Sequence, residues 1–455
     1  MSFSEKIFRA YDIRGLIKDE LSIEFAYLLG ASFVNFLKKK NIDLNGKKIV
    51  IGRDMRESGL KYKEKLIAGI IDQGIDVVDI GLATTPLFNF ACVNYAEHVA
   101  GIMITASHNP AEYNGFKLTM GDGLPIAGDN GLMEIKEMCK NFNFEKTENI
   151  GQVFEKNVFI DYKSKLFSLV DVQNFKKMKI VIDAGNGMAK ATFPEILKDF
   201  NIDVEYLFLE PDGNFPNHEA NPLKTETLKS LQEKVLAVKA DFGFALDGDA
   251  DRVGLVDEKG QIIPASFVGA IIGLEVLRKQ KGLMLYDLRT SRAVKEIWEK
   301  AGAKTDICPV GHSNIKKMMK ENNAIFASEL SLHLYYRDLH DVESGDLSLL
   351  YIIDLLSREN KKMSEIWEKM GKEKYHSGEI NFEVENKEEV MEKIKNKYSD
   401  GELNELDGIL INYKDFWFSV RCSNTESVIR LNLEANSEEL MREKVEEISE
   451  IIKKI

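Results

Sequence analysis

Cysteine is scarce in this sequence. The four cysteines, Cys92, Cys139, Cys308 and Cys422, lie far apart, and none belongs to a CxxC pair. A structural zinc site or a disulfide framework needs cysteines at shorter, repeated spacings. The sequence therefore indicates neither, and we expect a protein of the reducing cytoplasm.

Long apolar segments are also missing. No uninterrupted apolar run approaches the ~20 residues that a membrane helix needs, and residues 1–15, MSFSEKIFRAYDIRG, lack the apolar core of a signal peptide. Acidic residues outnumber lysine and arginine, and the net charge of −13 argues against a polyanionic partner such as nucleic acid. We expect a soluble protein that has no membrane or nucleic-acid partner and acts on a small molecule.

Several common motifs of catalysis and nucleotide binding do not occur. The absence of a Walker A sequence argues against ATP as a phosphoryl donor. The segment DAGNGMAK contains Gly185 and Gly187 but lacks the third glycine of a dinucleotide-binding loop. The GxSxG sequence of many serine hydrolases is absent as well.

The chain does contain a threefold internal repeat. Each repeat has a short apolar strand, a helical stretch, a second strand, another helical stretch and a third strand. The first strands are predicted at 47–54, 178–187 and 282–289, the second at 74–81, 201–213 and 302–313, and the third at 101–110, 242–252 and 323–333. This alternation favours mainly parallel sheets covered by helices. Ligands gather at the carboxyl ends of such strands, where Ser107, Asp247 and Glu329 lie in successive repeats.

The last part of the chain has a different pattern. It is rich in lysine and glutamate, with amphipathic helical stretches at 387–398 and 437–455 and short strands between them. This pattern predicts a small α+β domain. We therefore predict the α/β class, with three similar α/β domains at 1–150, 151–256 and 257–368 that have mainly parallel mixed sheets, and a smaller C-terminal α+β domain at 369–455.

Three aspartates alternate in the segment DGDADR. Asp247, Asp249 and Asp251 directly follow an apolar strand, and residues at period two in an extended segment point to the same side. Three converging carboxylates repel one another unless a cation neutralises them, and Mg²⁺ prefers such oxygen ligands. A solvated acidic turn, an EF-hand loop with Arg252 in place of its glycine, and an aspartyl nucleophile at Asp247 are the alternatives.

A candidate catalytic serine lies in TASHNP, after the apolar run at 101–104. The pairs Asn109-Pro110 and Asn114-Gly115 are typical of turns, so we expect Ser107 to be exposed on a loop that can hold a phosphate. A simple helix or turn cap is one alternative, and hydrolase chemistry with the adjacent His108 is another.

Two further segments carry polar side chains that suit a ligand. The segment 421–425, RCSNT, combines a guanidinium with short hydrogen-bonding side chains and can bind an anion, although an ordinary turn would look the same. Glu329, Ser331 and His333 alternate, so they can share one face toward a polyhydroxylated ligand. A strand of a solvated sheet has the same pattern.

Together, TASHNP, DGDADR and RCSNTE resemble the motifs of the α-D-phosphohexomutase family, especially of bacterial phosphomannomutase/phosphoglucomutase. The resemblance extends over nearly the whole chain, from FRAYDIRG at 8–15 to the segment 421–435. FRAYDIRG favours the glucose/mannose branch over the glucosamine branch. The resemblance implies four domains around a central cleft, three of them alike.

The resemblance also implies a role for each motif. Ser107 would carry a phosphoryl group and share Mg²⁺ with Asp247, Asp249 and Asp251, and Lys117 would act as an acid or base near the reacting hydroxyl. Arg252 would face the phosphoryl group, and we place His108 beside it among the catalytic residues. The sugar phosphate would be bound by the remaining residues: Arg9, Tyr11, Arg14, Arg289, His312, Glu329, Ser331, His333, Arg421, Ser423, Asn424, Thr425 and Arg430.

The implied activity is that of an isomerase that interconverts hexose 1-phosphate and hexose 6-phosphate, of mannose, glucose or both. A hexose 1,6-bisphosphate would be its intermediate and activator. We expect a monomer, with a dimer as the alternative.

The sequence departs from the family pattern at the sugar loop, which we define as residues 328–333. The usual GEMSGH is SELSLH here, so Ser328 and Leu332 replace two glycines. Arg289 stands where family members often have lysine, and Ser427 replaces the proline of SNTEP. The loop conformation and the sugar preference therefore stay open.

Overall fold

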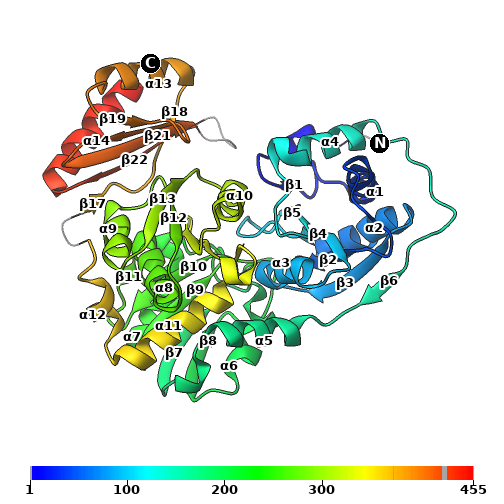
Figure 1. Cartoon of the computed structure of the whole chain (residues 1–455), viewed down its shortest axis with the longest axis horizontal. Helices are drawn as coiled ribbons and strands as arrows, with labels where there is room; N and C mark the ends of the chain where they lie inside the picture. Colours follow the sequence, from blue (N-terminus) through cyan, green and yellow to red (C-terminus); the bar gives the residue numbers. More distant parts are fainter. Residues whose placement is uncertain (1–2, 372–373, 423–427, 454–455) are drawn as a thin grey trace.

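The computed structural model of the protein describes residues 3–371, 374–422 and 428–453, which form four domains, each built on one sheet (Figure 1). Three domains have mixed sheets with helices on their faces, and the domain at the carboxyl end of the chain has an antiparallel sheet. Among the described residues, no helix combines the length and the apolar character that crossing a bilayer requires.

The first sheet has the strand order β1-β5-β4-β2-β3-β6. Its strands are β1 (Ile13–Leu16), β2 (Lys48–Arg53), β3 (Asp76–Leu82), β4 (His98–Ile104), β5 (Tyr113–Met120) and β6 (Val153–Glu155), and its helices are α1 (Ile23–Lys39), α2 (Ser58–Ile71), α3 (Thr85–Asn94) and α4 (Met133–Lys140). The Ser22 side chain caps α1 by accepting a hydrogen bond from the Phe25 N–H, and the helix packs on α2 and α4.

The second sheet has the order β11-β10-β9-β7-β8. Its strands are β7 (Met178–Asp183), β8 (Ile202–Leu207), β9 (Phe242–Leu246), β10 (Val253–Asp257) and β11 (Ile262–Ile263), and its helices are α5 (Phe159–Leu169), α6 (Phe193–Leu197) and α7 (Lys229–Val238). Every residue of β9 and β10 is buried, which shows that other parts of the protein pack against both faces of these strands.

The third sheet has the order β13-β12-β14-β15-β16. Its strands are β12 (Leu283–Asp287), β13 (Lys304–Cys308), β14 (Phe326–Ser328), β15 (Leu334–Tyr336) and β16 (Val342–Glu343), and its helices are α8 (Ala265–Lys279), α9 (Arg292–Lys300), α10 (His312–Asn322), α11 (Gly345–Glu359) and α12 (Met363–Trp367). Side chains of the second and third domains share one apolar core, which includes Phe244 and Phe326.

The same strand arrangement recurs in the three sheets. The first strand of each repeat lies between the second and the third and runs parallel to both, in the orders β3-β2-β4, β8-β7-β9 and β13-β12-β14. An antiparallel strand then pairs with the third: β5, β10 or β15. The predicted α/β class, the repeat and the mainly parallel mixed sheets are confirmed.

The prediction of a turn at Asn114-Gly115 was wrong, because both residues lie inside β5. Asn114 is buried and its side chain donates to Ser58 Oγ at 2.7 Å. Gly115 pairs with β1, and a Cβ there would lie 2.2 Å from the Ile13 carbonyl oxygen. A pair that usually forms a turn serves here for close contact between two strands.

The C-terminal sheet has the order β17-β22-β21-β20-β19, and β18 also pairs with β22. Its strands are β17 (Tyr375–His376), β18 (Ile380–Glu383), β19 (Glu402–Asn404), β20 (Ile409–Asn412), β21 (Phe416–Cys422) and β22 (Val428–Ala435), and its helices are α13 (Lys387–Lys397) and α14 (Glu438–Lys453). The predicted α+β domain is confirmed. It lies against the third domain, where Leu410 and Trp417 pack on Leu288 and Val310.

The division of the chain at 150, 256 and 368 stays a prediction. Strand β6, at 153–155, pairs with β3 in the first sheet, and β11, at 262–263, pairs with β10 in the second. Both sheets therefore extend a few residues past the predicted ends of their domains.

Candidate active site

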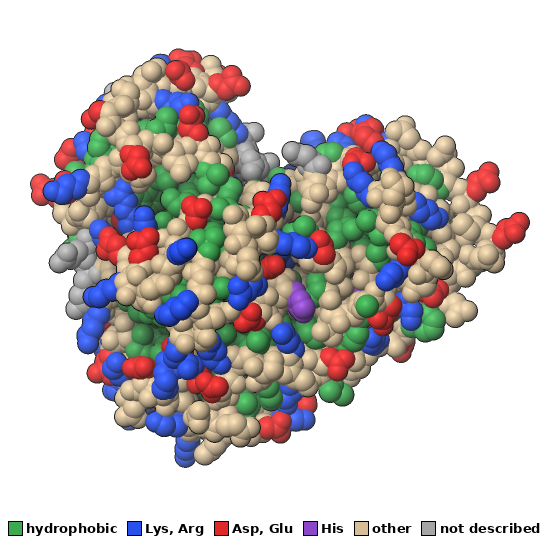
Figure 2. Space-filling model, in the orientation of Figure 1, with side chains coloured by type: hydrophobic (Ala, Val, Ile, Leu, Met, Phe, Trp, Pro, Cys, Tyr) green, Lys and Arg blue, Asp and Glu red, His purple; other side chains and the backbone are tan. Residues whose placement is uncertain are grey.

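A cavity of about 910 Å³ lies between residues of all four domains. Figure 2 shows a notch between the C-terminal domain and the first domain. Many predicted site residues line the cavity: Arg9, Tyr11, Arg14, His108, Arg252, Arg289, His312, Glu329, Ser331, His333, Arg421 and Arg430. A smaller cavity of about 60 Å³ is lined by Ser107, Lys117 and Asp251 and shares several residues with the first. Ser423, Asn424 and Thr425 lie outside the described residues.

Ser107 lies on the loop between β4 and β5, residues 105–112, which we call the serine loop. Only 2% of the residue is exposed, so the expectation of an exposed serine was wrong. The loop of the second domain that carries the three aspartates covers it, because a Cβ on Gly248 would lie 2.4 Å from the Ser107 carbonyl oxygen. We call this covering segment, residues 247–252, the metal loop.

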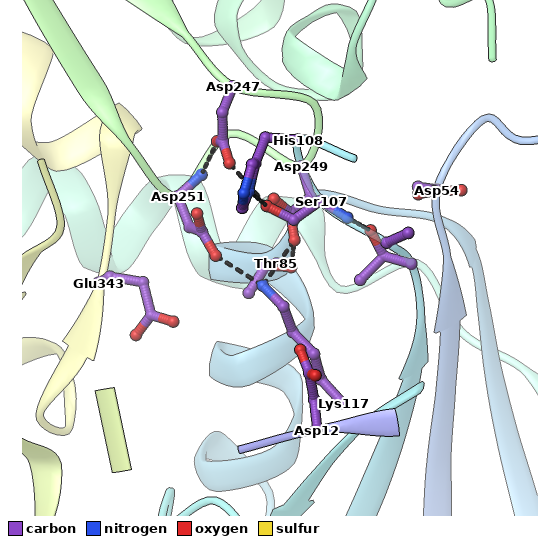
Figure 3. Close-up of polar contacts among 12 residues, drawn as sticks. Asp12, Asp54, Thr85, Ser107, His108, Lys117, Asp247, Asp249, Asp251 and Glu343 are labelled. Atoms are coloured by element: carbon purple, nitrogen blue, oxygen red, sulfur yellow. Dashed lines mark hydrogen bonds and ion pairs between the residues drawn. The ribbon is translucent and has the colours of Figure 1, made fainter. Parts of the chain in front are cut away.

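The serine hydroxyl points at the metal loop (Figure 3). Ser107 Oγ donates to Asp247 Oδ2 at 2.8 Å and lies 3.1 Å from His108 Nδ1. Burial, followed by the charges of Arg252 and Arg14, lowers the pKa of His108 well below its usual value. His108 is therefore a neutral imidazole beside the hydroxyl.

The three aspartates of the metal loop are buried and converge. Their carboxylate oxygens lie within 4.8 Å of one another. Asp247 Oδ1 accepts hydrogen bonds from the backbone N–H groups of Asp251 and Arg252, at 3.0 and 3.1 Å. Burial and the two neighbouring carboxylates raise the pKa of Asp247 well above its usual value. A cation at this position would relieve the repulsion between the carboxylates.

Lys117, on β5, reaches the same cluster from the first domain. Its Nζ donates to Asp249 Oδ2 and Asp251 Oδ2, both at 2.7 Å. Burial alone would lower the pKa of Lys117, but the two carboxylates outweigh burial and raise it. The lysine is therefore an ammonium here, and it neutralises part of the acidic charge.

The metal loop has the donor chemistry that a divalent cation needs. It offers carboxylate oxygens, and the Oδ1 atom of Asp249 is buried without a hydrogen-bond partner among the described residues. Oxygen ligands of this kind suit Mg²⁺. The EF-hand alternative is wrong, because strand β10 follows the loop where an EF-hand has a helix.

The sugar loop joins the metal loop through backbone and side chains. Arg252 and His333 form a backbone bridge, and the Val253 N–H donates to the Leu332 carbonyl at 3.1 Å. His333 Nε2 lies 3.2 Å from Asp251 Oδ1. Burial alone would lower the pKa of His333, but Asp251 and then Glu329 raise it to about 9. The imidazole therefore carries a positive charge at neutral pH.

Leu332 has a strained backbone in the sugar loop. Its φ is +71°, in the left-handed region, and only 4% of the residue is exposed. Its side chain packs in the shared core of the second and third domains. The other replaced glycine, Ser328, lies against Gly269, where an added Cβ would come within 2.7 Å of the serine Cβ. A glycine in α8 thus makes the space that Ser328 needs.

The far side of the large cavity carries a network of arginines and acidic residues. Arg289 Nη2 pairs with Asp287 at 2.7 Å and with Glu329 at 3.4 Å. Its Nη1 lies 3.4 Å from Glu379, which also lies 3.3 Å from Arg430 Nη1. Sequence reasoning did not identify Glu379, which tethers the C-terminal domain to Arg289.

The first domain contributes Arg14 and Tyr11. Arg14 Nε donates to Asp12 at 2.9 Å, and its Nη1 donates to the Ala106 carbonyl at 3.2 Å and to the Asn109 side chain. The Tyr11 hydroxyl donates to the Val310 carbonyl at 3.2 Å, and its ring contacts that of His312. The Tyr11 contacts connect the first domain with the third across the cavity, whereas the Arg14 contacts lie within the first domain.

Sequence reasoning also missed Arg56 and Thr85. Arg56 donates to several carbonyls of the serine loop. The Thr85 hydroxyl donates to Asp249 Oδ2 at 2.6 Å. A signal was present, because both residues closely follow the carboxyl ends of β2 and β3, where ligand-binding residues gather.

The chain matches family models along most of its length. The models describe phosphoglucomutase/phosphomannomutase alpha/beta/alpha domain I at residues 5–146, domain II at 157–260, domain III at 265–373, and the C-terminal domain at 379–451. A phosphomannomutase of Methanocaldococcus jannaschii is 39% identical over 99% of this chain and 98% of its own length. A phosphomannomutase/phosphoglucomutase of Pseudomonas aeruginosa is 33% identical over 95% of this chain and 92% of its own length.

Solved structures agree with these relatives. A phosphoglucomutase/phosphomannomutase family protein from Burkholderia thailandensis has a TM-score of 0.90 at 29% identity, over 99% of this chain and 98% of that one. A variant of N-acetylphosphoglucosamine mutase from Aspergillus fumigatus, solved in complex with glucose 1,6-bisphosphate, has a TM-score of 0.61 at 14% identity, over 99% and 96% of the two chains, and shows the shared fold.

Fold, site and relatives together define an isomerase that works by phosphoryl transfer. Since four models of one family cover successive parts of the chain, and full-length relatives exceed 30% identity, the chain belongs to the phosphoglucomutase/phosphomannomutase family.

Proposed function

We propose that the protein interconverts the 1-phosphates and 6-phosphates of mannose and glucose, with Ser107 as the phosphoryl carrier. The observation that carries the proposal is the contact of Ser107 Oγ with Asp247 Oδ2 at 2.8 Å, in a buried site beside an arginine-lined cavity. The names of the relatives support both sugars as substrates.

The chain's own residues account for transfer in both directions. A phosphoserine at 107 donates its phosphoryl group to the free hydroxyl of a hexose phosphate, and the proton of that hydroxyl ends on the serine oxygen. Lys117 is an ammonium and lines the same small cavity as Ser107, so it can supply that proton and then accept the one from the sugar. Arg252 and Arg14 stabilise the spread negative charge of the transferring group.

Asp247, Asp249 and Asp251 would hold Mg²⁺, which, when bound, supplies further positive charge next to the phosphoryl group. The Asp247 nucleophile of the alternative mechanism is disfavoured by its contacts. One of its oxygens accepts two backbone hydrogen bonds, and the other accepts the Ser107 hydroxyl.

The bisphosphate intermediate must turn over within the cavity, so that its second phosphate faces Ser107. The cavity of about 910 Å³ gives room for this turn. Arg421 and Arg430 lie at its far side and would hold the phosphate that is not reacting. Glu329 and His333 would contact the sugar hydroxyls between the two phosphate positions.

The test is a coupled assay with glucose 1-phosphate and with mannose 1-phosphate, each with a trace of the bisphosphate. Ser107→Ala should lower kcat by about 10³-fold or more, because it removes the covalent carrier. Ser168→Ala, an exposed serine on α5, serves as the matched control. Intact-mass analysis should show an added mass of about 80 Da that maps to Ser107. An active Ser107→Ala variant, together with an inactive Asp247→Asn variant, would refute the proposal in favour of an aspartyl nucleophile.

A further inference from the structure

Arg56 lies behind the serine loop, on the side away from the cavity. It follows β2 by three residues and is 1% exposed. Its Nη1 donates to the carbonyls of Pro110 and Tyr113, at 2.7 and 3.0 Å. Its Nη2 donates to the carbonyls of Ser107 and Asn109, at 3.1 and 2.5 Å. One guanidinium thus binds four backbone oxygens from the serine loop and the start of β5.

Asp54 fixes the orientation of this guanidinium. Its Oδ2 accepts from Arg56 Nε at 3.2 Å, and its Oδ1 accepts from the Arg56 backbone N–H at 3.0 Å. Asp54 is fully buried, and so is its partner. A planar fork held on one edge by a carboxylate presents its remaining N–H groups in fixed directions.

The second domain closes over the same arginine. A Cβ on Gly213 would lie 2.8 Å from Arg56 Cα, and the ring of Phe215 lies 5.1 Å from the guanidinium carbon. The Ser107 carbonyl is therefore held between the Arg56 guanidinium on one side and Gly248 of the metal loop on the other.

The serine itself needs such support. Ser107 has a φ of +51°, in the left-handed region, which is about 1–2 kcal/mol less favourable for a residue with a Cβ. This conformation directs Oγ to Asp247, at 2.8 Å. Strained backbone at a reacting group persists only where surrounding contacts determine it, and the Arg56 hydrogen bonds are such contacts.

We propose that Arg56 is a positioning residue for phosphoryl transfer: by holding the carbonyls of the serine loop, it aims Ser107 Oγ at the metal loop without touching the substrate. The inference rests on the proposed function, since Ser107 must be the carrier. Arg56 lies behind the serine loop and does not line the large cavity. Its effect on the rate would therefore be exerted through the serine loop.

The test compares Arg56→Met and Arg56→Lys with the wild type in the mutase assay. Arg53→Met is the matched control, because Arg53 donates to the Asp54 carbonyl at 3.0 Å and is not among the side chains that bind the serine loop. A displacement of the reacting atom by about 1 Å lowers a rate by about 100-fold. We therefore expect kcat to fall by about 100-fold in Arg56→Met, with KM for the sugar phosphate changed less than about threefold.

Two further readouts separate positioning from general stability. The rate at which the bisphosphate phosphorylates Ser107, followed by intact mass, should fall in parallel with kcat. Added guanidinium chloride at low millimolar concentration should restore part of kcat in Arg56→Ala, while sodium chloride at equal concentration should not. Lysine offers only three donors from a single nitrogen, so Arg56→Lys should fall between the wild type and Arg56→Met.

Circular dichroism and thermal melting establish which variants are folded, and Arg56→Lys carries the test if Arg56→Met does not fold. A folded Arg56→Met or Arg56→Lys with kcat within twofold of the wild type would overturn the inference. A KM that rises as much as kcat falls would also overturn it, since Arg56 would then affect substrate binding. A wild type without mutase activity would count against the proposed function instead, which distinguishes the two failures.

Discussion

Leu332 offers a direct test of the sugar loop, because glycine should be better than alanine at this buried position. Its φ of +71° lies in the left-handed region, where a Cβ is unfavourable. At ordinary backbone angles, glycine is about 0.5–1 kcal/mol less stable than alanine. At a left-handed position the order reverses, since alanine is strained there and glycine is not.

The expected change in the free energy of unfolding depends on the burial of the Leu332 side chain and on the strain of its backbone. Leu332 is 4% exposed and packs in the shared core, so Leu332→Ala should lower the free energy of unfolding by about 2–5 kcal/mol. Leu332→Gly also loses the buried Cβ, which costs about 0.8 kcal/mol, but it relieves about 1–2 kcal/mol of backbone strain. We expect Leu332→Gly to be more stable than Leu332→Ala by up to about 1 kcal/mol, and both to be less stable than the wild type.

Thermal unfolding of the two variants measures this difference. A change of about 1 kcal/mol corresponds to roughly 2–4 °C in Tm for a unit of about 150–250 residues, the size of the second and third domains that share this core. Leu334, on β15 in the same core and 2% exposed, is the matched control. Leu334→Ala should be more stable than Leu334→Gly. If alanine is also the better residue at 332, the sugar loop does not hold the left-handed conformation and the reasoning fails.

Three further predictions follow from other contacts. Gly248→Ala places a methyl group 2.4 Å from a serine-loop carbonyl oxygen, so it should lower Tm and abolish transfer. Gly59→Ala is the control: its Cβ would have its nearest neighbour at 3.6 Å, so Tm and transfer should stay unchanged in the same assays. Burial would lower the pKa of His218, but Asp183, 3.1 Å away, raises it. The charged pair therefore contributes stability below about pH 6.5 and loses it as the pH rises through the folded pKa. His218→Asn should thus lower Tm more at about pH 5.5 than at about pH 8.5, and an equal loss at both would contradict this. Chelation of divalent cations should abolish transfer with little change in Tm, because Lys117 already neutralises two carboxylates. Lys117→Met removes that charge, so its Tm should depend strongly on added Mg²⁺, which calorimetry can measure.

Much of the fold could be predicted from the sequence, because the repeated strands are apolar runs with the lengths and branched residues of buried strands. The ends of those strands also identified Ser107, Asp247 and Glu329, since ligands gather at one edge of a parallel sheet. The antiparallel strand β5 was not identified. Its Asn114-Gly115 pair has the local chemistry of a turn, and only the contact with β1 shows why glycine is needed.

The residue types of the candidate site could be predicted, but the burial of Ser107 and the pairing of residues from different domains could not. Ser107 and Asp247 are 140 positions apart, and nothing local shows that one domain buries the serine of another. Arg56 and Thr85 follow strand ends, which gave a signal, but their partners lie on distant loops that the local sequence does not identify. Burial and pairing of this kind are decided by the packing of domains, which short sequence patterns do not report.

The three similar α/β domains each bring one group of side chains to the candidate site: the Ser107 hydroxyl comes from the first, three carboxylates come from the second, and the proposed sugar contacts come from the third. Because the cavity is lined by residues of all four domains, we expect any single domain expressed alone to be inactive even when it folds. Three domains of similar fold thus contribute different groups to one site, and we expect activity to depend on how these domains pack together.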